Sequence, residues 1–309
     1  MIGSIRSEQW LQTVLCPICQ VDDAEVIYPS RRRERALREN EFRPSGDTPL
    51  EDPLVRCRRC SMQYVNPRTP SELVLTGYAS AVDEAFVSQS AGREETFRRC
   101  LKTLQSVWRK PPGSLLDIGT ANGSFLKVAR DAGWTVSGCE PNRWLCEWCE
   151  RNYGIRVNPG TLFEASYAPG SFDVITLWDV LEHTPDPRAV LQECERLLAP
   201  GGLVAVNYPD IGSLAARIMA RRWVFLISVH HYYFDRHTIK ALLEVVGLAP
   251  VLMRPHIQRL SLDYIFTRAE PLTGAVARGL RALTRNLGLG NQLVPYWVGQ
   301  TLVIAQRKS

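Results

Sequence analysis

The sequence has no hydrophobic run long enough to cross a membrane. Its strongest apolar stretch, WVFLISV at 223–229, is far shorter than the roughly 18 to 20 residues that a transmembrane helix needs. The first residues, MIGSIRSEQWLQTVL, also lack the apolar centre of a secretory signal. We therefore expect a cytoplasmic protein, and we interpret 223–229 as a buried strand.

The stretch LLDIGTANGSF lacks the features of two common phosphate-binding loops. No Gly-Lys-Ser/Thr follows it, and Ala121 and Ser124 stand where a dinucleotide-binding G-x-G-x-x-G would need glycine. Gly119 and Gly123 still allow a ligand to approach the backbone closely between a strand and a helix. Asp117, just before this turn, would repel a pyrophosphate but attract an ammonium group. The turn therefore indicates a cationic ligand rather than a phosphate.

The positive charge is unevenly distributed along the 309 residues, whose net charge is +5. Residues 254–309 hold seven Arg and one Lys against two acidic residues, which gives +6. Between 16 and 60, nine Arg are balanced by nine acidic residues. Phosphate-backbone binding needs net positive potential. The arginine-rich run that contains Arg32, Arg33, Arg35 and Arg38 therefore does not favour nucleic acid as a partner.

From residue 114 onward, segments typical of strands and helices alternate. This pattern predicts an α/β fold with a mostly parallel sheet covered by helices. PYWVGQTLVIAQRK near the end is expected to be a single last strand. We expect a small module at 1–70, a helical linker or lid at 71–110 and the α/β domain at 111–309, with a helical insertion at about 256–295.

Five segments follow one another in the order and spacing of class I S-adenosylmethionine (SAM)-dependent methyltransferases. They are LLDIGTANGSF, GCEPN, SFDVITLWDVLEHTPDP, LLAPGGLVAVNYP and HHYYFDRHTIKALLEVVGL. The chain resembles that family over roughly 114–255 and the last strand. The resemblance implies a Rossmann-like sheet with helices on both faces, and SAM as cofactor.

The resemblance also implies a cofactor site spread over several strand ends. Glu140, 21 residues beyond Gly119, would accept hydrogen bonds from the ribose hydroxyls, and Leu162 would lie near the adenine. Ala121 stands where the family usually has glycine. The expected cofactor-binding residues are Asp117, Gly119, Thr120, Ala121, Gly123, Glu140, Pro141, Leu162, Trp178 and Asp179.

Candidate catalytic residues cluster in the stretch WDVLEHTPDP. Methyl transfer to a hydroxyl or carbon acid needs a base, and Asp179, Glu182 and His183 are candidates. His183 is the expected general base, although it could instead structure the loop. His230 and His231, which we expect to follow an apolar strand, could supply a second base. The similar acid-x-x-Glu-His stretch of ubiquinone-pathway O-methyltransferases also suggests a divalent metal at Asp179, Glu182 and His183.

Two CxxC pairs predict a structural zinc site. Cys16, Cys19, Cys57 and Cys60 form two knuckles, and tetrahedral coordination of zinc by the four thiolates is the expected result. Four filled positions leave none for substrate, so this zinc should not be catalytic. A third CxxC in the stretch CEWC at 146–149 lies on a predicted helix, where buried small side chains explain it better.

The stretch GAVARGLRALTRNLGLG predicts an amphipathic basic helix at about 275–287. Val276, Leu280, Leu283 and Leu287 share one face, and arginines flank it. The helix could be a lid that packs its apolar face on the domain. Alternatively it could offer a surface for peripheral contact with a membrane or a lipid carrier.

The sequence therefore predicts a SAM-dependent methyltransferase that acts on a hydroxyl or carbon of a small molecule. LVRCRRCSMQYVNPRTPSEL resembles the zinc-ribbon start of methyltransferases in sugar and polysaccharide pathways, which favours a sugar, glycan or lipid-linked acceptor. Two alternatives stay open. One is an RNA methyltransferase that binds through the zinc module, and the other is a SAM-binding interaction protein without catalysis.

Overall fold

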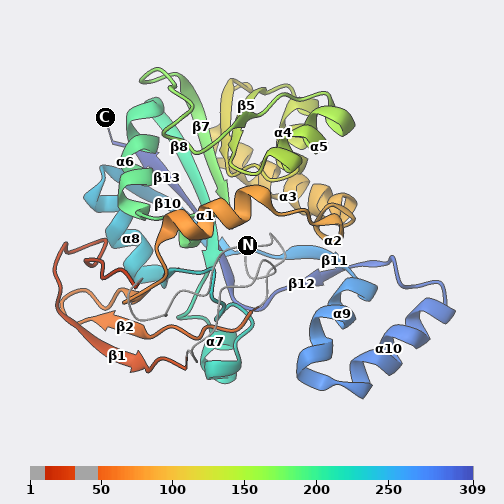
Figure 1. Cartoon of the computed structure of the whole chain (residues 1–309). Helices are drawn as coiled ribbons and strands as arrows, with labels where there is room; N and C mark the ends of the chain where they lie inside the picture. Colours follow the sequence, from red (N-terminus) through yellow and green to blue (C-terminus); the bar gives the residue numbers. More distant parts are fainter. Residues whose placement is uncertain (1–10, 32–47, 309) are drawn as a thin grey trace.

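The computed structural model describes residues 11–31 and 48–308, and its centre is a seven-stranded sheet (Figure 1). The strand order is β10-β13-β8-β7-β4-β5-β6. The pairs from β8 to β6 are parallel, whereas β13 runs antiparallel to both β8 and β10. The expected α/β sheet with helices on both faces is confirmed.

The strands of this sheet alternate with helices along the chain. The strands are β4 (Ser114–Ile118), β5 (Thr135–Glu140), β6 (Asn158–Pro159), β7 (Phe172–Trp178), β8 (Leu198–Pro209), β10 (Leu248–Pro255) and β13 (Gln300–Arg307). The helices that cover it are α3 (Ser90–Trp108), α4 (Ser124–Asp131), α5 (Arg143–Tyr153), α6 (Pro187–Leu197) and α8 (Arg236–Val245).

Each face of the sheet has its own hydrophobic core. Because successive strand residues point to opposite faces, Leu115 packs in the core that α3, α4 and α5 cover, and Leu116 packs in the core of α6 and α8. Asp235 caps the start of α8 through a reciprocal bond with Thr238. Cys146 and Cys149 lie on α5 and are buried, as the sequence predicted.

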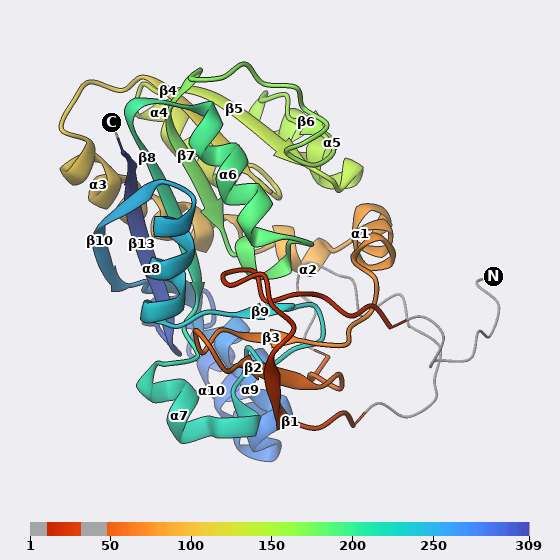
Figure 2. The same cartoon turned by 90° about the vertical axis from the view of Figure 1, so that its left-hand side faces the viewer.

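A second, four-stranded antiparallel sheet lies beside the first. It runs in the order β1 (Ala24–Tyr28), β2 (Leu54–Cys57), β3 (Gln63–Val65) and β9 (Tyr232–Tyr233), and Figure 2 shows β9 alongside β3. The short helices α1 (Ser71–Ser80) and α2 (Glu84–Val87) connect β3 to α3. Arg32, Arg33, Arg35 and Arg38, which entered the charge count, lie outside the described residues.

A helical hairpin protrudes from the body between β10 and β13 (Figure 1). It consists of β11 (Gln258–Ser261), α9 (Leu262–Thr273), α10 (Ala275–Asn286) and β12 (Leu293–Tyr296), with β11 paired to β12. The four apolar side chains that the sequence placed on one face of α10 are 42% to 64% exposed. The interpretation of this helix as a lid packed on the domain is therefore wrong.

Two expected strands differ from the structure. The stretch 223–229 is a series of turns, in which Leu226 N bonds to Trp223 O and His230 N bonds to Ile227 O. It connects η4 (Ala220–Arg222), which follows α7 (Leu214–Met219), to β9. The expected last strand is divided into β12 and β13, with the left-handed Gly299 between them. Among the residues described, no helix is both long and apolar enough to cross a membrane.

Candidate functional site

The glycine turn after β4 adopts a strained shape that brings backbone N–H groups to the sheet edge. Gly119, Ala121 and Gly123 have φ values of 62°, 50° and 76°, and only glycine takes this region without cost. A Cβ on Gly119 would come within 2.7 Å of Val180 Cγ2. Ala121 tolerates the conformation, and its N–H donates to Glu140 Oε2 at 2.8 Å.

Glu140 is fully buried at the end of β5. Besides Ala121, the N–H of Asn142 donates to it at 2.8 Å, and burial raises its pKa to about 7 against the effect of these two bonds. Asn142 Nδ2 also donates to the carbonyl oxygens of Tyr78 and Ala81 at 2.7 and 2.8 Å. The end of α1 is thereby held over this carboxylate.

Asp117 is the second buried carboxylate of the edge. Thr176 Oγ1 on β7 donates to it at 2.6 Å, yet burial raises its pKa to about 7. A buried carboxylate becomes ionised when a cation is placed against it. The arrangement therefore fits the ammonium group that the sequence led us to expect.

Asp179 follows β7 with a φ of 54°, which is unusual for a residue with a side chain. Asn207 Nδ2 and Gln300 Nε2 donate to its Oδ1 at 2.7 and 2.9 Å, and its own N–H donates to Asn207 Oδ1. These bonds fix the carboxylate at the sheet edge. The preceding Trp178 has a buried Nε1 with no hydrogen-bond partner among the residues described, so a polar ligand could satisfy it.

Leu162 and Pro141, both expected to bind the cofactor, differ in their surroundings. Leu162 is buried in the core beneath α6 and α8. Glu164, two residues later, accepts from the N–H and hydroxyl of Thr161. Pro141 lies directly between Glu140 and Asn142.

Arg93 on α3 is a candidate that the sequence reasoning missed. Its guanidinium lies 3.8 Å above the ring of Phe86, and its buried Nε has no partner in the described part of the chain. Burial lowers its pKa, and the nearby Tyr264 and Asp179 oppose that effect. A cation at this edge suits the carboxylate of a methionine moiety. No local motif surrounds Arg93, so only the fold could reveal it.

The second group at this end of the sheet consists of Glu182, His183 and His230. One ligand atom from each lies within 4.8 Å of the others, and the two imidazole centroids are 4.5 Å apart. The expected third member, Asp179, does not belong to this group in the structure. Its Oδ1 accepts hydrogen bonds from Asn207 and Gln300 instead. His230, from a segment distant in the sequence, is the third member of the group.

Hydrogen bonds define which nitrogen of each imidazole carries the proton. Nδ1 of His183 lies 3.0 Å from Val229 O, and Nδ1 of His230 lies 2.9 Å from Phe225 O. A carbonyl oxygen only accepts, so both Nδ1 atoms donate and both Nε2 atoms keep a lone pair in the neutral ring. Burial lowers both pKa values, that of His230 far below its usual value.

Glu182 lies buried beside these imidazoles. Neither of its carboxylate oxygens has a hydrogen-bond partner within the described ranges, and burial, followed by the charge of Asp179, raises its pKa well above the usual value. The side chain of His231 is not part of this group, although its backbone N–H donates to Glu182 O at 2.9 Å. Burial, then the neighbouring Arg68, lowers the pKa of His231 to about 3.

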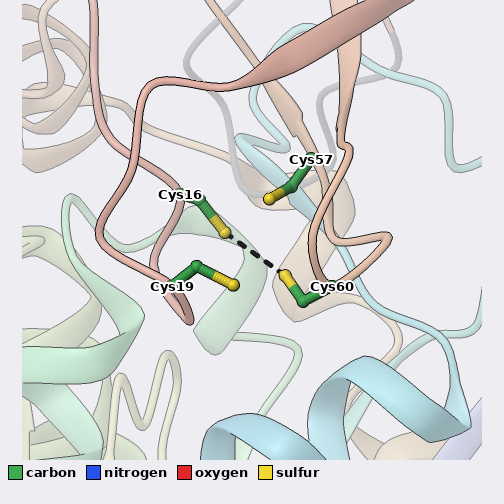
Figure 3. A group of neighbouring side chains, drawn as sticks. All are labelled: Cys16, Cys19, Cys57 and Cys60. Atoms are coloured by element: carbon green, nitrogen blue, oxygen red, sulfur yellow. Dashed lines mark hydrogen bonds between the residues drawn. The ribbon is translucent and has the colours of Figure 1, made fainter.

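The four cysteines of the two CxxC pairs converge (Figure 3). All four Sγ atoms lie within 4.8 Å of one another, and those of Cys16 and Cys60 are 3.5 Å apart. Burial raises the pKa of the Cys16 thiol to about 11, so this sulfur would become a thiolate only next to a cation. The donor set fits the tetrahedral zinc expected from the sequence.

Comparisons with known proteins identify a methyltransferase domain in this chain. A family model described as "Methyltransferase domain" matches residues 93–252. The chain is 32% identical over 176 residues to a "Ubiquinone biosynthesis O-methyltransferase" of Ralstonia nicotianae, covering 53% of this chain and 69% of that protein. A protein of the same name from Thiobacillus denitrificans is 34% identical over 96 residues, 29% of this chain and 41% of its own.

The first curated relatives are matched over only part of their length. The chain spans about two fifths of each of them, 41% to 43% for the first three. A solved complex of the Haloferax volcanii Trm112 methyltransferase activator and a methyltransferase matches the fold with a TM-score of 0.51. That match has 15% identity and covers 73% of this chain and 96% of the other.

Proposed function

The chain belongs to the methyltransferase-domain family, and from that membership we propose that it transfers a methyl group from SAM to a hydroxyl of a small-molecule acceptor. When bound, SAM supplies an already activated methyl group, so the protein must align the acceptor, exclude water and remove the acceptor's proton. Two sets of side chains at the sheet edge support this proposal, one suited to binding the cofactor and the other to removing the proton.

The first set supports cofactor binding. Asp117 suits the ammonium group, Arg93 the carboxylate, and Glu140 the ribose hydroxyls. The observation that carries the proposal is the pair of buried carboxylates, Asp117 and Glu140, whose pKa values burial raises to about 7. A site for a neutral ligand would not need two such carboxylates, and a phosphate site would be repelled by them.

The second set supports proton removal from the acceptor. His183 is neutral and has a free Nε2 beside the cofactor edge, so it can accept the proton of a hydroxyl directly. The group of Glu182, His183 and His230, whose ligand atoms lie within 4.8 Å of one another, would also suit a divalent cation. In that case the cation would lower the pKa of a bound hydroxyl, and His183 would be a ligand rather than the base.

The acceptor class follows from two resemblances. The curated relatives are named O-methyltransferases of ubiquinone biosynthesis, which favours an oxygen acceptor. The cysteine-containing stretch resembles methyltransferases of sugar and polysaccharide pathways, which favours a sugar, glycan or lipid-linked intermediate. We propose a hydroxyl group as the methyl acceptor.

Labelling of a host lysate tests the proposal. The purified protein would be incubated with methyl-labelled SAM and the lysate, which would then be separated into RNA, protein, lipid-extractable and small soluble fractions. Label in the soluble or lipid fraction is expected. His183→Gln should lose it while keeping affinity for S-adenosylhomocysteine, and His237→Gln, which changes an exposed histidine of α8, should keep both. Label in RNA, or binding without label, would overturn the proposal.

We further propose that α10 makes peripheral contact with an anionic lipid surface. Its exposed apolar row is flanked by Arg278, Arg281 and Arg285. On α9, Glu270 binds Arg278 at 3.1 Å, and Asp263 binds Arg281 at 2.9 Å and also pairs with Arg285. Three arginines therefore face two acids, which leaves positive charge beside the apolar row. Such a helix lies in the interface of a membrane without crossing it.

A further inference from the structure

The cysteine module is the part of the chain up to residue 70 that holds Cys16, Cys19, Cys57 and Cys60. The acceptor side of the site is the group of Glu182, His183 and His230. The two are connected through one β-sheet. Strand β3, which follows Cys60, pairs with β9 through Gln63–Tyr233 and Tyr64–Tyr232. One step further, Val65 N donates to His231 O at 2.9 Å. The segment that carries both histidines is thus a strand of the module's sheet.

The beginning of the same segment is held by the other side of the module. Leu50 N donates to Leu226 O, and Ser228 N donates to Thr48 O, both at 2.9 Å. Residues 225–234, which we term the histidine segment, therefore carry backbone bonds to the module at both ends. A chain of turns with this many bonds to one neighbour depends on that neighbour for its shape.

Arg68 adds a side-chain connection to this arrangement. It is buried, its Nη2 donates to Pro185 O at 2.7 Å, and its guanidinium lies 5.0 Å from the ring centre of Tyr232. The hydroxyl of Tyr232 donates to the same Pro185 oxygen at 2.9 Å. Arg68 thereby joins the end of the module, β9 and the loop after His183.

The histidine segment in turn fixes the catalytic candidates. His231 N donates to Glu182 O, and His183 Nδ1 donates to Val229 O. The orientation of His183 and its position relative to His230 therefore depend on residues 229–231. No comparable bond joins the module to Asp117 or Gly119 among the described residues.

A metal bound by the four cysteines would supply much of the module's rigidity. Cys16, Cys57, Met62 and Tyr64 belong to the core beneath α6 and α8, but strands β2 and β3 are only four and three residues long. So small a unit gains much of its order from a structural metal. Loss of metal should therefore loosen β3 and, through it, β9.

We infer that the metal-filled cysteine module is the positioning element of the acceptor side. It holds the histidine segment so that His183 and His230 meet Glu182. To the cofactor half it is joined only by the apolar core that also contains Leu116, since no hydrogen bond links it to Asp117 or Gly119 among the described residues. This inference rests on the proposed function for the meaning of those histidines. According to this inference, the module supports the site from within the protein and does not serve to recruit RNA or a protein partner.

Hydrogen exchange on the purified, zinc-loaded full chain tests the inference without any acceptor. After zinc is removed by chelation, the amides of Val65 and His231 should exchange at least about tenfold faster, while those of 115–123 change by less than about twofold. Affinity for S-adenosylhomocysteine should stay within about twofold, and added zinc should restore protection. Unchanged exchange at His231 would overturn the inference. So would equal loosening of 115–123, since the module would then support the whole fold.

Arg68→Gln supplies a second measurement that keeps the cysteines intact. Exchange at 229–233 should rise while bound zinc stays at one ion per chain, and Arg68→Lys should retain part of the protection. Arg188→Gln is the matched control, because Arg188 donates from α6 to Ile18 O at 3.4 Å but makes no hydrogen bond to β9 among the described residues. If Arg68→Gln and Arg188→Gln behave alike, Arg68 is not a positioning residue. These readouts need no turnover, so they stay distinct from a failure of the labelling experiment.

Discussion

Replacing Asp117 with asparagine should remove about half of the pH dependence of cofactor binding, on a logarithmic scale. Asp117 and Glu140 both have a pKa that burial raises to about 7 in the free protein. Binding an ammonium group and ribose hydroxyls requires the ionised forms, so complex formation releases protons. The sign follows directly: affinity increases as pH rises through 7 and decreases as pH falls below it.

The magnitude can be worked out from these two pKa values. A carboxyl group with a pKa of about 7 is about one eleventh ionised at pH 6.0 and about three quarters ionised at pH 7.5. One such group changes the affinity by about eightfold over this range, and two change it by about seventyfold. In Asp117→Asn only the contribution of Glu140 remains, so the change should fall to about eightfold.

Calorimetric titration with S-adenosylhomocysteine between pH 6.0 and 7.5 measures this change. Repeating it in buffers with different ionisation enthalpies counts the protons released. Asp173→Asn is the matched control, because Asp173 accepts from Ser114 at the opposite end of the same two strands. It should keep the seventyfold change. A flat pH profile in the unaltered protein, or a full profile in Asp117→Asn, would refute the reasoning.

Three further outcomes are expected. In a denaturant titration, Gly123→Ala should lower the free energy of unfolding by about 2 to 4 kcal/mol, because the new Cβ would collide with the sulfur of Cys149 at positive φ. Gly170 also has a positive φ but lies in open space. Gly170→Ala should therefore lower the free energy of unfolding by only about 1 to 2 kcal/mol. Cys57→Ser should lose the bound zinc measured by elemental analysis, whereas Cys146→Ser should keep one ion per chain; equal zinc in both would contradict the four-cysteine site. Leu283→Asp should weaken cosedimentation with vesicles of anionic phospholipid, and an unchanged bound fraction would contradict the lipid surface proposed for α10.

The sheet and the cofactor edge could be predicted because their signals are local. The pairs β4 with α4 and β5 with α5 each follow one another directly along the chain. Asp117, Gly119 and Glu140 are positioned by the ends of β4 and β5. Such positions follow once the alternation of strand and helix is read correctly. The zinc site could also be predicted from the two CxxC pairs, because two pairs of this spacing suit one metal whatever the path of the chain between them.

The acceptor side could not be predicted in the same way. His230 lies near Glu182 in a structure in which β9 pairs with β3, and neither segment indicates that pairing on its own. The turns at 223–229 were mistaken for a strand because they are as apolar as one. Trp223 and Leu226 bury their side chains in a small core with Leu54, and composition does not distinguish such a turn from a buried strand.

The pairing of β3 with β9 also has a consequence for the order in which the chain can fold. Tyr64 finds its partner in Tyr232, 168 residues further along. While the protein is being synthesised, β2 and β3 can pair and the cysteines can collect their metal, but one edge of that sheet stays open until β9 has left the ribosome. An open edge of this kind is a site for wrong pairing with other chains. The last steps of folding should therefore close the two sheets together, and a chain truncated before residue 232 should aggregate even when its four cysteines hold zinc.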